Sequence, residues 1–255
     1  GFSKNADETF QKWGGHDAAL SDIIREIRTF RPDVIVSRFD GSARDGHGNH
    51  QAAGILSREA YKAAADPNRF PEQLREGLLP WQAKKLYIGN TPQNEATLRP
   101  NVGAYSPILG MSYAQFSTEG LKYQASQGVG GFYVAPGDVM RNYKLAESTL
   151  GQQRPAETDF FDGIDVTLPG LAARLGADES KAPFLRRALS QADKLVEQAA
   201  TNFRPEDPAA AAPMLVSALQ LLRDAARQLD PLPIAPAAKA EVLAELKDKQ
   251  QQFAD

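Results

Sequence analysis

The pattern of apolar and polar positions divides this chain into two parts of different character. Between residues 17 and 165, helical patterns alternate with short apolar runs and with turns rich in glycine and proline, whereas residues 184–253 carry mainly helical patterns. Alternating helices and buried strands are typical of α/β folds, and consecutive helices are typical of helical bundles. We therefore expect an α/β fold over residues 1–165 and an α-helical region over residues 170–255, with the boundary at residues 165–169.

A helix followed by a buried strand opens the first part. Apolar residues recur at helical spacing from Asp17, a suitable N-cap, to Phe30, and Pro32 ends this pattern. Residues 34–39 then form a mostly apolar run with β-branched side chains, which predicts a strand covered on both faces. A helix that leads into a buried strand is half of a βαβ unit.

Further elements follow from the same reasoning. Helical spacing predicts helices over residues 51–65 and 112–126, an apolar run predicts a strand over residues 84–88, and glycine and proline predict long surface loops from 126 to 165. In the second part, three helices are expected over residues 184–203, 213–229 and 237–253. The pattern leaves open whether these helices bind a partner or cap the first part.

Two of the three histidines lie in one short motif after the first predicted strand. The motif is Asp45-Gly46-His47-Gly48-Asn49-His50, a glycine-rich turn that leads into the next helix. Imidazole is a common zinc ligand, and two histidines at this spacing can face the same side, so that one binds metal while the other transfers protons. The alternative is that both are polar loop residues that hydrogen-bond the backbone. The third histidine, His16, is interpreted as part of a helix start.

Composition narrows the class of protein. The 255 residues contain no cysteine, and the formal net charge is -3. Without cysteine there are neither disulfides nor thiolate metal ligands, and without a basic excess nucleic acid is not an expected partner. No apolar run reaches about 18 residues, so no transmembrane segment is expected.

Three segments, taken in order, resemble one enzyme family. They are Arg31-Pro32-Asp33-Val34-Ile35-Val36, Gly46-His47-Gly48-Asn49-His50-Gln51-Ala52-Ala53 and Ser126-Gln127-Gly128. Together they resemble the LmbE-like (PIG-L-type) zinc-dependent de-N-acetylases, over roughly residues 1–165. The N-terminal Gly1-Phe2-Ser3-Lys4 looks like a large bacterial branch of that family, whose members are often exported and often carry extra domains.

The resemblance implies a Rossmann-like partial parallel sheet and zinc-dependent hydrolysis of the N-acetyl group of an amino sugar or glycoconjugate. Zinc in such a site acts as a Lewis acid and activates a water. At matching positions, His50 is similar to a zinc ligand of the family, and His47 to the histidine that protonates the departing amine or stabilises the oxyanion. Arg38, Tyr105 and Gln127 are expected to contact the substrate.

Two departures from the family pattern bear on activity. Asn49 stands where many relatives have aspartate, and an amide cannot raise the pKa of a neighbouring imidazole as a carboxylate would. The family's other zinc ligands and general base come from an Ala-His-Pro-Asp-Asp-Glu-type motif, which does not occur in this sequence. Asp40 and Asp45 are interpreted as turn formers and not as replacement ligands.

We therefore expect this chain to be the part of a deacetylase that follows the missing motif, with the remaining zinc ligands in a segment absent from the chain. A parallel sheet without its first strands would expose an unpaired edge. The expected partners are an N-acetylated sugar or glycoconjugate substrate and that segment or another domain of the same protein. Export to the periplasm or cell exterior is an expectation from the resembling branch alone, and the sequence leaves the specific substrate open.

Two alternatives remain beside the enzyme. The chain is a non-catalytic carbohydrate-binding remnant, with a pocket lined by His47, Tyr105, Tyr123 and Gln127, or it is an interaction scaffold that acts through its helical end.

Overall fold

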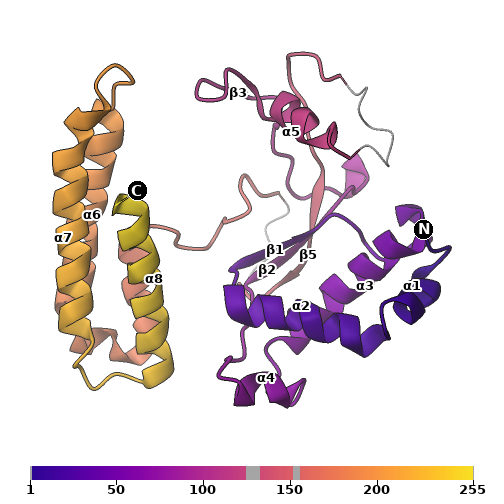
Figure 1. Ribbon diagram of the computed structural model, residues 1–255, viewed down its shortest axis with the longest axis horizontal. Coiled ribbons are helices and arrows are strands. Elements are labelled where there is room, and N and C mark those ends of the chain that lie inside the picture. The colour runs from indigo at the N-terminus through magenta and orange to yellow at the C-terminus, as the bar shows by residue number, and fades with distance from the viewer. Residues whose placement is uncertain (1, 125–132, 152–155, 255) are drawn as a thin grey trace. The chain divides into compact units, whose positions relative to one another are not determined.

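The computed structural model describes residues 2–124, 133–151 and 156–254. The chain divides into two compact units, Gly1–Gly163 and Ile164–Asp255 (Figure 1). The first unit is a small α/β structure and the second is helical, so the expected α/β class with an α-helical C-terminal region is confirmed. The assignment of residues 1–165 to part of a deacetylase domain stays a prediction.

A three-stranded sheet forms the centre of the first unit. Its strands are β1 (Val34–Ser37), β2 (Lys85–Gly89) and β5 (Tyr143–Ser148), in the order β1-β2-β5. β1 pairs with β2 in parallel, whereas β5 pairs with β2 antiparallel, so the sheet is mixed and not wholly parallel. Every residue of β2 is buried, as expected for a central strand.

The expectation that the first strand is covered on both faces is wrong. β1 lies at the edge of the sheet, and Val36 at its centre is 48% exposed. Side chains alternate between the two faces of a strand. Ile35 packs against the helices, whereas Val36 points to the other face and is half exposed. The apolar run alone could not show which of the two faces is covered.

Helices cover one face of this sheet. They are α1 (Ala6–Lys12), α2 (His16–Phe30) and α3 (Gly48–Ala63), followed by the short α4 (Pro71–Arg75). α2 and α3 lie side by side against the sheet (Figure 1). Both were predicted, but α2 begins at His16 with Gly15 as its N-cap instead of Asp17, and α3 begins at Gly48, three residues before the predicted start at 51.

Arg28 joins α2 to the chain that follows α3. It is 2% exposed. Its guanidinium donates to the backbone carbonyl oxygens of Ala64, Asp66, Arg69 and Phe70 and to Oε1 of Gln73. Burial lowers the pKa of Arg28. Because all of these acceptors lie between residues 64 and 73, one side chain holds the whole turn after α3 in place.

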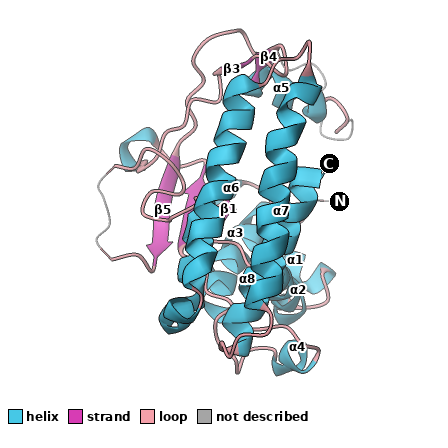
Figure 2. Ribbon diagram, turned by 90° about the vertical axis from the view of Figure 1, so that its left-hand side faces the viewer, coloured by secondary structure: helices cyan, strands magenta, loops and turns pink. Residues whose placement is uncertain are grey.

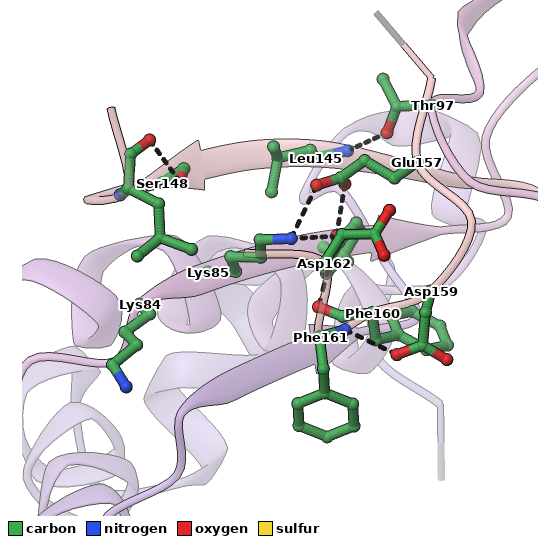
Figure 3. Close-up of polar contacts among 12 residues, drawn as sticks. Lys84, Lys85, Thr97, Leu145, Ser148, Glu157, Asp159, Phe160, Phe161 and Asp162 are labelled. Atoms are coloured by element: carbon green, nitrogen blue, oxygen red, sulfur yellow. Dashed lines mark hydrogen bonds and ion pairs between the residues drawn. The ribbon is translucent and has the colours of Figure 1, made fainter. Parts of the chain in front are cut away.

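A buried ion pair anchors the end of the first unit to β2 (Figure 3). Nζ of Lys85 lies 2.6 Å from Oε1 of Glu157, and the two side chains are 2% and 4% exposed. The Tyr87 hydroxyl donates to the other carboxylate oxygen of Glu157 and accepts from Lys85 Nζ at 3.2 Å. Burial, with the hydrogen bond to Glu157, raises the pKa of Tyr87 well above its ordinary value. Both ions are therefore satisfied inside the protein.

The segment from 126 to 165 was expected to be loop only, and β5 corrects that expectation. Only Tyr143, Leu145 and Ala146 are apolar in this strand, too few for a clear alternating pattern. Pairing with the buried edge of β2 decides its conformation instead, since strand formation depends strongly on tertiary context.

Two short strands and a helix complete the first unit. β3 (Tyr105–Ser106) pairs with β4 (Met111–Ser112), and α5 (Tyr113–Leu121) follows directly. Ser112 and Gln115 form a capping box that starts α5. The predicted helix at this place is confirmed, although it ends at Leu121 and not at 126. Short 3₁₀ helices lie at Ala43–Asp45 and Gln93–Glu95.

The second unit contains three long helices, as predicted. They are α6 (Pro183–Asn202), α7 (Ala212–Leu229) and α8 (Pro236–Ala254), preceded by 3₁₀ turns over Leu168–Lys181, with a further one at Pro208–Ala211. α6 and α7 lie side by side (Figure 2). The core of the unit includes the fully buried Leu185 and Leu189, one turn apart on α6, with Leu222 of α7 and Leu246 of α8.

Candidate functional site

The loop from β1 to α3 is held in shape by its own aspartates. The Asp45 carboxylate accepts from the Gly41 N–H at 2.7 Å, and the Asp40 carboxylate accepts from the Ser42 N–H at 2.7 Å and pairs with Arg44. The interpretation of Asp40 and Asp45 as turn formers is thus confirmed. Burial opposes ionisation of Asp40, but hydrogen bonds from Ser42 and the Arg44 guanidinium together lower its pKa to about 2.

Glycines let this loop pack closely on its neighbours. A Cβ at Gly48 would lie 1.9 Å from the backbone oxygen of Asn5, and a Cβ at Gly54 would lie 2.1 Å from the Gly41 nitrogen. The Gly48 N–H donates to the Ser3 carbonyl at 2.7 Å. The N-terminal residues, the loop and the first turn of α3 are therefore in direct contact where the histidine motif lies.

The two motif histidines take part in a continuous stack of rings. His50 stacks on Phe39 with 3.9 Å between ring centroids, His47 lies 3.9 Å from His50, and Phe2 lies 4.4 Å from His47. The predicted spacing argument is supported, since His47 and His50 face the same side. Phe39 lies two residues after the end of β1, so the stack also attaches the histidines to the end of that strand.

His50 is oriented by the backbone. Its Nδ1 lies 3.0 Å from the Asp45 carbonyl oxygen. Because a carbonyl can only accept, Nδ1 carries the proton in this hydrogen bond, and Nε2 keeps its lone pair. A backbone carbonyl that holds the second ring nitrogen in this way is typical of histidines that bind metal through Nε2.

His47 has a buried nitrogen without a partner. It is the N-cap of α3, but its side chain makes no capping hydrogen bond, and its Nδ1 is buried with no hydrogen bond among the described residues. Burial, and secondarily the neighbouring His50, lower the pKa of His47. A neutral imidazole is therefore favoured at this position.

Asn49 lies between the histidines but turns away from them. Its Oδ1 accepts a hydrogen bond from the Thr9 hydroxyl at 3.1 Å, which ties the first turn of α3 to α1. His16 is explained by a different set of contacts: its Nδ1 lies 3.0 Å from Asp17 and its Nε2 lies 2.8 Å from Glu59 of α3. The interpretation of His16 as part of a helix start is confirmed, because it is the first residue of α2.

The metal-ligating residues of the described chain do not by themselves make a complete metal site. Within residues 2–124, 133–151 and 156–254, no group of three or more His, Asp or Glu side chains is arranged to hold a metal ion. The chemistry and orientation of His50 fit one zinc ligand. Further ligands, if zinc binds here, are not among those side chains.

A polar cavity lies next to the histidine stack, at the carboxyl ends of β1 and β2. It has a volume of about 560 Å³, and Arg38, Asn90, Thr91 and Arg141 line it. Arg38 was a predicted substrate contact, and its guanidinium lies 5.8 Å from the ring centroid of Phe39, the residue that stacks on His50. Ligands of open α/β sheets commonly bind at this end of the strands.

The structure does not bring the other predicted contacts to this cavity. Tyr105 lines a separate cavity of about 490 Å³ with Met111 and Gln115, next to α5. Tyr123 is 90% exposed. Gln127 lies outside the described residues. The pocket that was expected to combine His47, Tyr105, Tyr123 and Gln127 is thus not assembled from its described members.

Sequence reasoning missed Asn90, Thr91 and Arg141 as lining residues. Asn90 and Thr91 come just after the strand predicted over residues 84–88. The rule that ligands bind at the carboxyl ends of strands would have pointed to them. Arg141 precedes β5, a strand that the sequence pattern did not reveal, and no local signal marks it.

Several curated proteins are similar to this chain. A 1D-myo-inositol 2-acetamido-2-deoxy-alpha-D-glucopyranoside deacetylase from Thermobispora bispora is 30% identical in an alignment 196 positions long that covers 58% of this chain and 62% of the relative. A protein of the same description, numbered 2, from Frankia casuarinae is 31% identical over 101 residues, covering 38% of this chain and 31% of the relative. A mycothiol S-conjugate amidase from Streptomyces coelicolor is 32% identical over 83 residues, covering 31% and 27%.

The similarity is partial. The chain spans about three fifths of the Thermobispora relative and smaller shares of the other two. No family model matches the chain. Two of these relatives are named deacetylases of an amino-sugar conjugate and one is named an amidase. Within the described residues, no helix has the length and apolar character needed to span a bilayer.

Proposed function

We propose that this chain is part of an LmbE-like, zinc-dependent de-N-acetylase that removes the acetyl group from an amino sugar or glycoconjugate. The observation that carries the proposal is the orientation of His50, whose Nδ1 is engaged by the Asp45 carbonyl so that Nε2 is available to a metal. The named activities of the similar proteins support the reaction class.

The remaining zinc ligands and the general base are proposed to come from a segment outside this chain. Two observations support this: the described residues hold no group of three metal-ligating side chains, and the chain spans 62% of the first relative. Bound zinc would supply a Lewis acid for the amide carbonyl and activate a water.

The residues of this chain have separate roles in the proposal. His50 binds the metal, and the Asp45 carbonyl and the Phe39 ring keep its imidazole in place. His47, whose ring centroid lies 3.9 Å from that of His50, donates a hydrogen bond to the oxyanion as the neutral imidazole, or protonates the departing amine after it has taken up a proton from the attacking water. The Nδ1 of His47 is buried without a hydrogen-bond partner among the described residues, which leaves it available for a hydrogen bond with a bound ligand.

The test uses this chain together with the segment that is proposed to carry the remaining ligands, and it begins with intact mass and zinc content, followed by amine release from N-acetylglucosamine conjugates. In the zinc-loaded protein, His50→Ala should remove most of the zinc and the activity, while His47→Ala should keep the zinc and lower kcat about 10²- to 10⁴-fold, the usual contribution of general acid-base catalysis.

His16→Ala is the matched control, because His16 is also half-buried but contacts Asp17 and Glu59 instead of the motif. It should change neither zinc content nor amine release. Activity that survives both His47→Ala and His50→Ala would refute the proposal. If the protein with that segment stays metal-free and binds N-acetylglucosamine without releasing amine, the carbohydrate-binding alternative is favoured.

A further inference from the structure

The polar cavity at the ends of β1 and β2 is positively charged. Its lining side chains include two arginines, Arg38 and Arg141, and no aspartate or glutamate. Neither guanidinium forms a hydrogen bond or ion pair with any other described residue, whereas most arginines elsewhere in the first unit are paired. Two cations without a counter-charge in one concave site raise the local concentration of anions.

The floor of the cavity is made of strand ends in a constrained conformation. Gly89 ends β2, and a Cβ there would lie 3.2 Å from the Tyr143 ring and 3.5 Å from the Arg38 Cα. Asn90 has a φ of 52°, in the left-handed region that non-glycine residues seldom adopt. The Thr91 hydroxyl donates to the Ile88 carbonyl at 3.1 Å. These contacts place the polar groups of Asn90 and Thr91 at the cavity wall.

The cavity is close to the histidine motif. Arg38 and His50 both contact the ring of Phe39, at 5.8 Å for the guanidinium carbon and 3.9 Å for the imidazole centroid. Arg38 is therefore within reach of a sugar conjugate that is bound at the histidines.

We infer that this cavity binds an anionic group of the ligand, a phosphate or a carboxylate, with Arg38 and Arg141 as the residues that determine this specificity. The inference rests on the proposed function, because it assigns the sugar conjugate to the anionic class. Guanidinium groups suit this task, since their planar arrangement of N–H donors matches the oxygens of phosphate and carboxylate.

The experiment measures binding by calorimetry at low ionic strength, with four probes. N-acetylglucosamine 1-phosphate and N-acetylmuramic acid carry a phosphate and a carboxylate, N-acetylglucosamine is neutral, and inorganic phosphate has no sugar. The variants are Arg38→Gln and Arg141→Gln. Arg75→Gln is the matched control, because Arg75 of α4 is exposed, loses the same charge and lies outside the cavity.

We expect at least one anionic sugar to bind about tenfold more tightly than N-acetylglucosamine. Each cavity variant should weaken that binding about tenfold, as expected for the loss of a hydrogen bond to a charged group. Arg75→Gln should change it less than about twofold, and affinity for N-acetylglucosamine should be the same in all variants. Tighter binding of N-acetylglucosamine 1-phosphate would identify phosphate as the preferred anionic group, and tighter binding of N-acetylmuramic acid would identify carboxylate.

Equal affinity for neutral and anionic sugars would overturn the inference, as would an equal effect of Arg75→Gln. Arginine-dependent binding of inorganic phosphate that is as tight as binding of the sugar phosphate would overturn the assignment to a sugar conjugate. Because binding is measured without turnover, the result is separable from the proposed function. Amine release without a preference for anionic sugars would refute only this inference, whereas arginine-dependent binding without amine release would refute only the deacetylase.

Discussion

The buried pair of Lys85 and Glu157 permits a sharp test of the energetics of the first unit. Glu157→Gln removes one charge and leaves the Lys85 ammonium 2% exposed in the interior. At the observed 2.6 Å, two unit charges attract by about 6 kcal/mol at an effective dielectric constant of about 20. Desolvation of the two ions offsets much of that attraction, and loss of one partner from such a pair costs about 3–5 kcal/mol.

We expect Glu157→Gln to lower the free energy of unfolding of the first unit by about 3 kcal/mol, because the Tyr87 hydroxyl remains as a partner for Lys85. Urea unfolding followed by tryptophan fluorescence reports this unit alone, since Trp13 and Trp81, the two tryptophans of the chain, both lie in Gly1–Gly163. The double variant Lys85→Met with Glu157→Gln should cost less than the sum of the single changes, because no unpaired ion remains.

Glu95→Gln is the control. Glu95 pairs with Lys144 at 2.9 Å, but the two side chains are 44% and 47% exposed. An exposed pair contributes about 0–1 kcal/mol. If Glu157→Gln costs no more than Glu95→Gln, or if the double variant is simply additive, the reasoning from burial and charge is refuted.

Three further outcomes are expected. Gly48→Ala should destabilise the first unit by more than about 2 kcal/mol in urea unfolding, because the new Cβ would lie 1.9 Å from the Asn5 backbone oxygen. Gly120→Ala in α5 is the control: its Cβ would meet no atom within 4 Å, so this change should be neutral or stabilising. Asp40→Asn should cost about 2 kcal/mol of unfolding free energy at pH 7, since the pKa of Asp40 in the folded protein is lowered to about 2. This contribution is present above the pKa of Asp40 in the unfolded chain, near 4, and is lost as the pH falls toward 2. A cost that does not shrink between about pH 5 and pH 3 contradicts the assignment. Leu222→Ala, at a fully buried position in the core of the second unit, should cost about 2–5 kcal/mol in far-UV circular dichroism melts while leaving the tryptophan transition of the first unit unchanged.

The sequence predicts those elements whose buried residues form an apolar run or recur at a regular spacing. β2 contains the apolar run Leu86–Ile88, and α2, α3, α6 and α7 carry apolar residues at helical spacing, so their positions agree with the prediction to within a few residues. β5 could not be found in this way, because its conformation depends on pairing with a strand more than 50 residues earlier. The same long-range pairing brings Arg141 to the cavity that Arg38 lines, and the spacing of these residues along the chain does not predict this.

The histidine motif was recognised from its own six residues, but its surroundings were not. The stack with Phe2 and Phe39 joins segments that flank the first helices, and the Asp45 carbonyl that orients His50 is a backbone group whose direction depends on the turn. A sequence specifies such a contact only through the fold as a whole.

Arg28 has a consequence for how this protein tolerates change. Of its five hydrogen-bond acceptors, four are backbone carbonyls, and only Gln73 contributes a side chain. A guanidinium that recognises main-chain oxygens is indifferent to the side chains those residues carry. The turn after α3 can therefore vary in composition at Asp66 and Arg69 while keeping its path, and a random library over these two positions should retain folded members far more often than a library at position 28. The residue that holds the path of this turn, Arg28, therefore lies in α2 and not in the turn itself.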